Sequence, residues 1–146
     1  MPVRRKALDW LELAEWLEDC KRDYRDGRYP SAVFHAEMCA QKAINSVIAA
    51  LGFEPGKTHR PTSVLKALIA GGLVNLKREL MSLLDKSIRY SITLEDQGTI
   101  PRYGWETVDR IVKPSEIYDK EKTALLIANA EAVLASIRKL LGEVDC

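Results

Sequence analysis

Histidine and cysteine, the residues that build many catalytic and metal sites, are scarce in this chain of 146 residues. The histidines are His35 and His59, and the cysteines are Cys20, Cys39 and Cys146. No two cysteines have the C-x-x-C spacing of a zinc or redox pair, so we expect reduced thiols. Two histidines leave little material for a histidine-rich metal site or a Ser-His-Asp triad. The sequence therefore predicts neither a bound metal nor a cofactor.

The chain also lacks the features that bind nucleotides in many enzymes and those that insert proteins into membranes. Neither G-x-G-x-x-G nor G-x-x-x-x-G-K-[ST] occurs, which excludes the usual glycine-rich phosphate loops. The apolar runs are too short to span a bilayer, and the N-terminal segment has no secretory apolar stretch. With 22 basic and 21 acidic side chains, the net charge of +1 gives no global attraction to nucleic acid or anionic lipid. We expect a cytoplasmic protein that recognises its partners locally.

Helical periodicity runs along nearly the whole chain. Apolar side chains three and four residues apart predict helices over 10–27, 30–52, 61–71, 73–88 and 115–142. The only extended piece that the pattern allows is a short one at 91–94, because no longer stretch alternates with period two. With 47% hydrophobic residues, the chain can bury a core of its own. We expect one all-α domain over 1–146, an antiparallel up-and-down bundle of about five helices.

The second predicted helix carries apolar residues on two faces. Its main stripe consists largely of small side chains, Ala36, Ala40, Ala43, Val47 and Leu51. Phe34 and Met38 lie roughly opposite this stripe. We expect the helix to be covered on both sides, either as the central helix of the bundle or by a second copy of the chain, so Phe34 and Met38 are candidate dimer-face residues. His35, between the two faces, is predicted to be partly buried and hydrogen-bonded.

An aromatic and basic segment, residues 99–118, precedes the last predicted helix. It contains Tyr103, Trp105, Tyr118, Arg102, Arg110 and Lys113. Such rings can stack on bases while the cations hold phosphate, although the segment could instead fold its aromatics onto the bundle as a lid. An arginine held between a proline and a tyrosine can offer two parallel hydrogen bonds to a phosphate or carboxylate. The candidate ligand-binding residues are Arg89, Tyr90, Arg102, Tyr103 and Trp105.

The order of these signals resembles the HEPN domain family. The turn at 24–29 and the alanine-rich stretch at 32–43 with its Gln-Lys-Ala centre are similar to the family's entry into its second helix. The signals that follow in the same order are Gly52, His59, Leu-Leu-Asp at 83–85, Pro-Arg-Tyr at 101–103 and Pro-Ser-Glu-Ile-Tyr at 114–118. The resemblance implies an all-α bundle that pairs as a homodimer and acts on nucleotides or RNA, commonly beside a minimal nucleotidyltransferase protein.

Many members of that family are endoribonucleases, and this chain departs from their motif. In those members a histidine that is separated from an arginine by four to six intervening residues activates the ribose 2′-hydroxyl, and the arginine holds the phosphate. The corresponding positions after Arg89 hold Leu94, Glu95 and Asp96. Arg28 and His35 have six residues between them but lie in a different part of the predicted fold. The departure predicts a module without ribonuclease activity.

Three functions remain open at this stage. The first, which we favour, is a homodimer that binds a nucleotide, an RNA end or a nucleotidyltransferase partner, since a few cations can bind one small polyphosphate. The second is a divergent, toxin-like endoribonuclease that uses Arg102 for phosphate and Tyr90, Tyr103 or Glu95 for proton transfer. The third is a structural or regulatory oligomer in which Arg102 pairs with a carboxylate and Trp105 fills the core.

Overall fold

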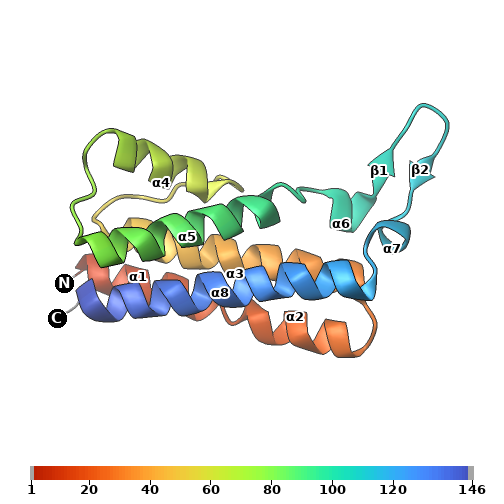
Figure 1. Cartoon of the computed structure of the whole chain (residues 1–146), viewed down its shortest axis with the longest axis horizontal. Helices are drawn as coiled ribbons and strands as arrows, with labels where there is room; N and C mark the ends of the chain where they lie inside the picture. Colours follow the sequence, from red (N-terminus) through yellow and green to blue (C-terminus); the bar gives the residue numbers. More distant parts are fainter. Residues whose placement is uncertain (1, 145–146) are drawn as a thin grey trace.

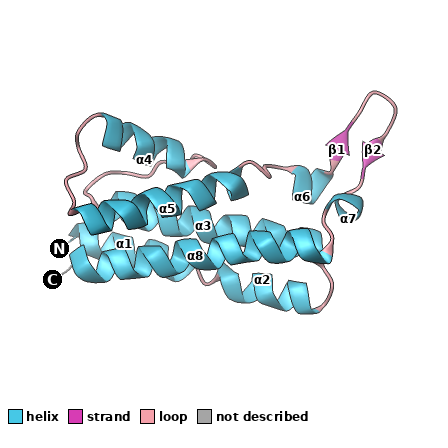
Figure 2. Ribbon diagram, in the orientation of Figure 1, coloured by secondary structure: helices cyan, strands magenta, loops and turns pink. Residues whose placement is uncertain are grey.

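The chain folds into the helical bundle that the periodicity predicts (Figures 1 and 2). This computed structural model describes residues 2–144, with side chains over 5–142. The long helices are α1 (Pro2–Leu13), α2 (Trp16–Arg25), α3 (Tyr29–Ala50), α4 (Pro61–Ala70), α5 (Arg78–Glu95) and α8 (Lys120–Val144). Two four-residue helices, α6 (Ile100–Tyr103) and α7 (Pro114–Ile117), flank an antiparallel hairpin of β1 (Trp105–Glu106) and β2 (Ile111–Val112). The predicted all-α class is confirmed.

Helix α3 is the centre of the bundle. It contacts each of the other seven helices of the described chain. Four residues of its predicted stripe are buried, and the fifth, Leu51, is half-buried; the buried ones are Ala36, Ala40, Ala43 and Val47. Small side chains at these positions allow α1, α2 and α8 to approach its backbone closely. The position of α3 at the centre of the bundle thus covers the face with the small side chains, whereas Phe34 and Met38 on the opposite face are only half-buried within the described chain.

The first predicted helix is in fact two helices, so the prediction of one continuous helix over 10–27 was wrong. Around residues 14–15 the backbone hydrogen bonds join residues three apart, not four apart as in an α-helix. Ala14 N–H donates to Leu11 C=O at 3.0 Å, and Leu17 N–H donates to Ala14 C=O at 3.2 Å. Such 3₁₀-type turns change the direction of a helix. The break lets α1 and α2 each pack against α3 and leaves Leu13 exposed.

The limits of the later helices also differ from the prediction. Residues 73–77 form a link, and α5 begins at Arg78 and continues to Glu95, so the expected extended piece at 91–94 is helical. Ser91 and Leu94 are both buried there, on a helix that packs against α8 and α3. Gly142 does not end the last helix, which runs to Val144. Its predicted apolar stripe is buried throughout, at Leu126, Ala130, Val133, Ile137 and Leu140.

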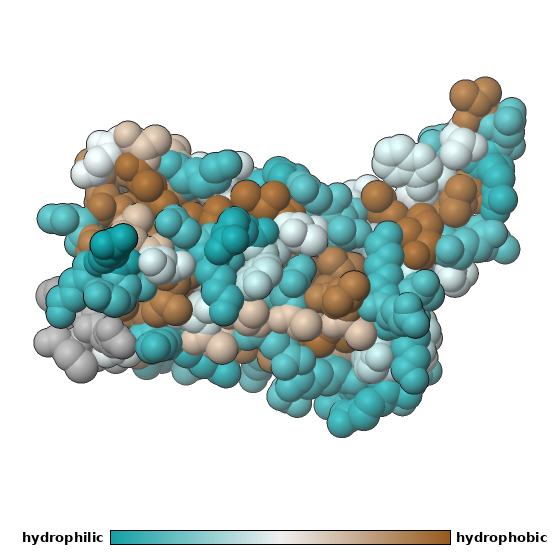
Figure 3. All heavy atoms as spheres, viewed as in Figure 1, coloured by the Kyte–Doolittle hydropathy of each residue, from teal (hydrophilic) through white to brown (hydrophobic). Residues whose placement is uncertain are grey.

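The hairpin projects from one end of the bundle, away from the end where both termini lie (Figure 1). We call residues 104–113 the arm. Its apolar side chains are strongly exposed, Trp105 by 58%, Val108 fully and Ile111 by 59%. Brown, hydrophobic patches lie on the surface of the projecting arm in Figure 3. The prediction that this segment folds onto the bundle as a lid is wrong for the arm.

None of the described helices combines the length and the apolar character needed to cross a membrane.

Candidate functional site

The aromatic and basic segment divides into three parts with different surroundings. Arg102 and Tyr103 form the end of α6, Trp105 lies in the first strand of the arm, and Tyr118 is buried in the core. Gly104 makes the turn from α6 into the arm with a backbone φ of +78°, and a Cβ at this position would collide with the carbonyl oxygen of Val112. The six residues that the sequence grouped together therefore do not form one surface.

Arg102 is stacked against aromatic rings next to α3. Its guanidinium carbon lies 5.0 Å from the ring centre of Phe34 and 5.4 Å from that of Tyr103. These distances are typical of cation–π contacts, which orient the guanidinium and leave its N–H groups free to donate. Among the side chains that the structure describes, no carboxylate lies within 4.0 Å of Arg102. The hypothesis that Arg102 is held by a carboxylate is thus wrong within these residues.

Glu37 lies one turn after Phe34 on α3, and sequence reasoning missed it. It is buried, and burial raises its pKa to about 7, an effect that Arg102 opposes and the charge of Glu95 increases. Its Oε1 accepts a long 3.5 Å hydrogen bond from Gln41 Nε2, while Oε2 has no partner among the described residues. A carboxyl group with a near-neutral pKa can take up or release a proton at neutral pH.

His35 belongs to a hydrogen-bonded cluster on the other side of Phe34. Its Nδ1 is 2.6 Å from Asp23 Oδ2, and the same oxygen accepts a 2.7 Å hydrogen bond from Ser31 Oγ. The imidazole also packs 5.3 Å from the ring of Trp16 and 5.6 Å from that of Phe34. The prediction of a partly buried, hydrogen-bonded histidine is confirmed. Asp23 favours the tautomer with the proton on Nδ1, which leaves Nε2 as an acceptor.

These residues form what we call the α3–α6 site, which consists of Asp23, Phe34, His35, Glu37, Arg102 and Tyr103. The ring of Phe34 contacts both His35 and the Arg102 guanidinium. This site has groups suited to a nucleotide or an RNA end. The arginine can donate to phosphate, the exposed tyrosine ring can stack on a base, and a histidine held by a carboxylate lies beside them.

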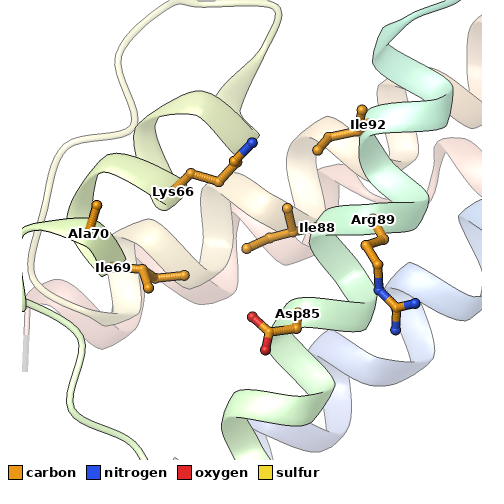
Figure 4. A pocket seen from close by; sticks show the side chains of 7 residues that line it. All are labelled: Lys66, Ile69, Ala70, Asp85, Ile88, Arg89 and Ile92. Carbon is orange, nitrogen blue, oxygen red and sulfur yellow. The ribbon is translucent and has the colours of Figure 1, made fainter.

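The other predicted candidates lie elsewhere. Arg89 borders a groove of about 640 Å³ between α4 and α5, with Lys66 and Asp85, over a floor of Ile69, Ile88 and Ile92 (Figure 4). The ring of Tyr90 lies 5.9 Å from Lys86 Nζ. Trp105 is exposed on the arm, which corrects the hypothesis that it fills the core. The structure therefore brings Arg102 and Tyr103 together but not the whole predicted set.

Glu95, an alternative proton-transfer candidate, has a structural position. It is buried and accepts hydrogen bonds from the backbone N–H and the hydroxyl of Thr62, in the first turn of α4. Burial raises its pKa, although the two bonds from Thr62 act in the opposite direction. An ion pair of 2.6 Å between Arg60 and Asp96 adds a second link between the same helix ends. Glu95 thus attaches α4 to α5.

Tyr118 connects the start of the last helix to the end of α5. Its hydroxyl donates a 2.9 Å hydrogen bond to Gln97 Oε1, and burial raises its pKa to about 12, with a further increase from the charge of Glu37. Tyr118→Phe keeps the ring and removes this bond, so we expect the free energy of unfolding in urea to fall by about 1 kcal/mol. Tyr103→Phe, at an exposed ring, is the matched control and should change it little. Equal stabilities of the two variants would contradict this assignment.

The sequence and the fold of this chain both resemble those of known proteins. The family model for the HEPN domain matches residues 7–140. The chain is 28% identical over 131 residues to "Putative toxin MJ1304" of Methanocaldococcus jannaschii, a match that covers 88% of this chain and 83% of that protein. Its fold is similar to the crystal structure of TT1696 from Thermus thermophilus, with a TM-score of 0.69, 21% identity and coverage of 92% and 98%. For ST0689, described as an archaeal HEPN homologue, the TM-score is 0.63, the identity 21% and the coverage 92% and 97%.

Proposed function

The chain belongs to the HEPN domain family, and from this premise we propose that it is a homodimeric module that binds a nucleotide or an RNA end at the α3–α6 site. In this proposal the module also contacts a minimal nucleotidyltransferase partner and does not cleave RNA itself. The proposal rests mainly on Arg102. Its guanidinium stacks on two aromatic rings and forms no ion pair with a carboxylate of the described chain.

The chemistry around Arg102 supports a phosphate ligand with a base beside it. A planar guanidinium donates two parallel hydrogen bonds to phosphate oxygens, and the Phe34 ring restricts its orientation before the ligand binds. Tyr103 is 69% exposed, so its ring is free to stack on a base. Binding of one phosphate at one arginine also suits a chain whose net charge is only +1.

Arg102→Ala should weaken the binding of labelled nucleotide or RNA by about 1.5–3 kcal/mol, roughly 10- to 150-fold, because a hydrogen bond to a charged group is lost. Arg102→Lys should restore little, since an ammonium group cannot give the two parallel bonds. Binding is measured by calorimetry, and circular dichroism checks the fold. Arg110→Ala is the matched control, because Arg110 is paired with Glu116 at 2.8 Å in the described chain. Unchanged binding by both Arg102 variants would assign Arg102 a structural role.

A second function, metal-independent RNA cleavage, is favoured by one observation, the hydrogen bond between Asp23 and His35. A carboxylate that holds a histidine leaves Nε2 able to accept the proton of a ribose 2′-hydroxyl, with Arg102 available for the phosphate. A toxin-like role would also agree with the name of the archaeal relative. Incubation with mixed RNA separates the two functions, because cleavage that disappears in His35→Ala supports this second one and intact RNA supports the binding module.

A further inference from the structure

Buried polar side chains occur every fourth residue along α3, outside the α3–α6 site as well as in it. Glu37, Gln41 and Asn45 lie on one face of the helix and are 4%, 4% and 5% exposed. Buried polar groups in proteins nearly always have a hydrogen-bond partner, and an unmet one is costly. Asn45 Oδ1 has none within the described chain. Asn45 Oδ1 is therefore available to accept a hydrogen bond from a bound ligand.

Gln41 and Asn45 border a pocket of about 220 Å³ between α1, α3 and the loop that leads to α4. This volume would hold roughly seven water molecules at about 30 Å³ each, or one small organic molecule. None of the nine lining residues is acidic, and three can carry positive charge, Lys42, Lys57 and His59. The composition of the pocket therefore suits an anion.

The pocket residues are held in place by contacts around them. Lys42 Nζ lies 5.3 Å above the ring of Trp10, so the ammonium group and the indole form one wall. Glu54, the acidic residue closest in sequence to the pocket loop, is bonded to Lys6 at 2.6 Å. At the other end of the loop, the Arg60 N–H donates a 3.0 Å hydrogen bond to Thr58 Oγ1. Both ends of the loop are thus fixed beside the pocket, and no carboxylate among the lining residues competes for its cations.

We propose that this pocket binds a small phosphomonoester that carries hydroxyl groups, such as a sugar phosphate. The phosphate carries about −1.5 to −2 charges at neutral pH and contacts Lys57, His59 and Lys42. A ligand hydroxyl donates to the unpaired Asn45 Oδ1, and the indole of Trp10 packs against the carbon skeleton. Arg102 does not line this pocket, so the inference does not depend on the proposed function of the α3–α6 site.

The test is calorimetric titration with ribose 5-phosphate and, separately, with inorganic phosphate. We expect saturable binding of ribose 5-phosphate that weakens tenfold or more in Lys57→Ala. Lys66→Ala, which removes an exposed lysine outside this pocket, is the matched control and should bind normally. Asn45→Leu should weaken the binding of ribose 5-phosphate tenfold or more but leave the binding of inorganic phosphate unchanged, because inorganic phosphate lacks the sugar hydroxyl that donates to Asn45 Oδ1.

Three results would overturn the proposal. They are the absence of saturable ribose 5-phosphate binding at millimolar concentration, equal effects of Lys57→Ala and Lys66→Ala, and loss of binding in Arg102→Ala, which would move the ligand to the α3–α6 site. Asn45→Leu should fold, because it replaces a buried amide whose Oδ1 is unpaired within the described chain by an apolar group of similar size. Circular dichroism checks this, and Lys57→Ala, at an exposed loop position, tests the phosphate contact in any case.

Discussion

Met38→Arg should convert the proposed homodimer into a monomer at micromolar concentration. Met38 is half-buried on α3, and its side chain lines the edge of the pocket near Trp10. A second copy packed over this face would bury the side chain completely. An unpaired guanidinium in such a contact costs on the order of 3–5 kcal/mol, enough to raise a dissociation constant by more than a hundredfold. Sedimentation velocity and light scattering measure the change directly.

The matched control introduces the same charge on another helix. Leu125 is 70% exposed on α8, so Leu125→Arg adds an arginine with no burial in the isolated chain. It should leave the dimer intact. Dissociation by Leu125→Arg but not by Met38→Arg would place the interface over α8, and a monomeric wild-type chain would refute the dimer itself. Phe34, the other candidate for this face, already contacts Trp16 and Arg102 within its own chain, so Met38 is the cleaner test.

Replacing Glu37 with glutamine should stabilise the protein at pH 8 and not at pH 4. Burial raises the pKa of Glu37 from 4.5 to about 7, so in this range the folded chain keeps a proton that the unfolded chain releases. The stability that the protonated group provides is complete below pH 4.5 and is lost as the pH rises through 7. Glutamine never ionises, so its advantage at pH 8 should be on the order of 2–3 kcal/mol.

Urea unfolding of the wild type and of Glu37→Gln between pH 4 and pH 8 tests this prediction. The quantity to compare is the difference between their free energies of unfolding at each pH. Glu95 also has a pKa raised by burial, and because its charge acts on Glu37, the difference between the two proteins includes the loss of this interaction. Glu12→Gln, at an exposed position on α1, is the matched control and should give a curve parallel to the wild type. A Glu37→Gln advantage that is the same at pH 4 and pH 8 would show that the charge of Glu37 is not what destabilises the fold.

The sequence was most informative where one helix face carries one type of side chain. The alanine stripe of α3 and the apolar stripe of α8 are buried as predicted, because periodicity directly encodes which face meets the core. Proline at the first turn correctly marked the starts of α3 and α4. The break at 14–15 could not be predicted in the same way, since apolar residues continue at helical spacing through it and only packing on α3 sets the bend.

The candidate site was only partly predictable for a related reason. Arg102 and Tyr103 were identified by their unusual neighbours, but the contact of Arg102 with Phe34 joins residues 68 positions apart, and no local pattern predicts such a contact. Glu37 did leave a signal, because Glu37, Gln41 and Asn45 recur at intervals of four and so share one face of an alanine-rich helix. A polar row of this kind indicates a hydrogen-bonded seam or a binding surface, and its spacing is visible in the amino-acid sequence itself.

The arm divides the molecule into two levels of local stability. Its strands pair over only two residues each, and a hairpin of this size has little stability of its own. At its base, Glu116 accepts bonds from Arg110 at 2.8 Å and from the Lys113 N–H at 2.7 Å, both in exposed positions. The arm can therefore open and close while the bundle stays folded, at a free-energy cost far below that of global unfolding. A partner that binds Trp105, Val108 and Ile111 could therefore change the conformation of the arm without changing the packing of α3.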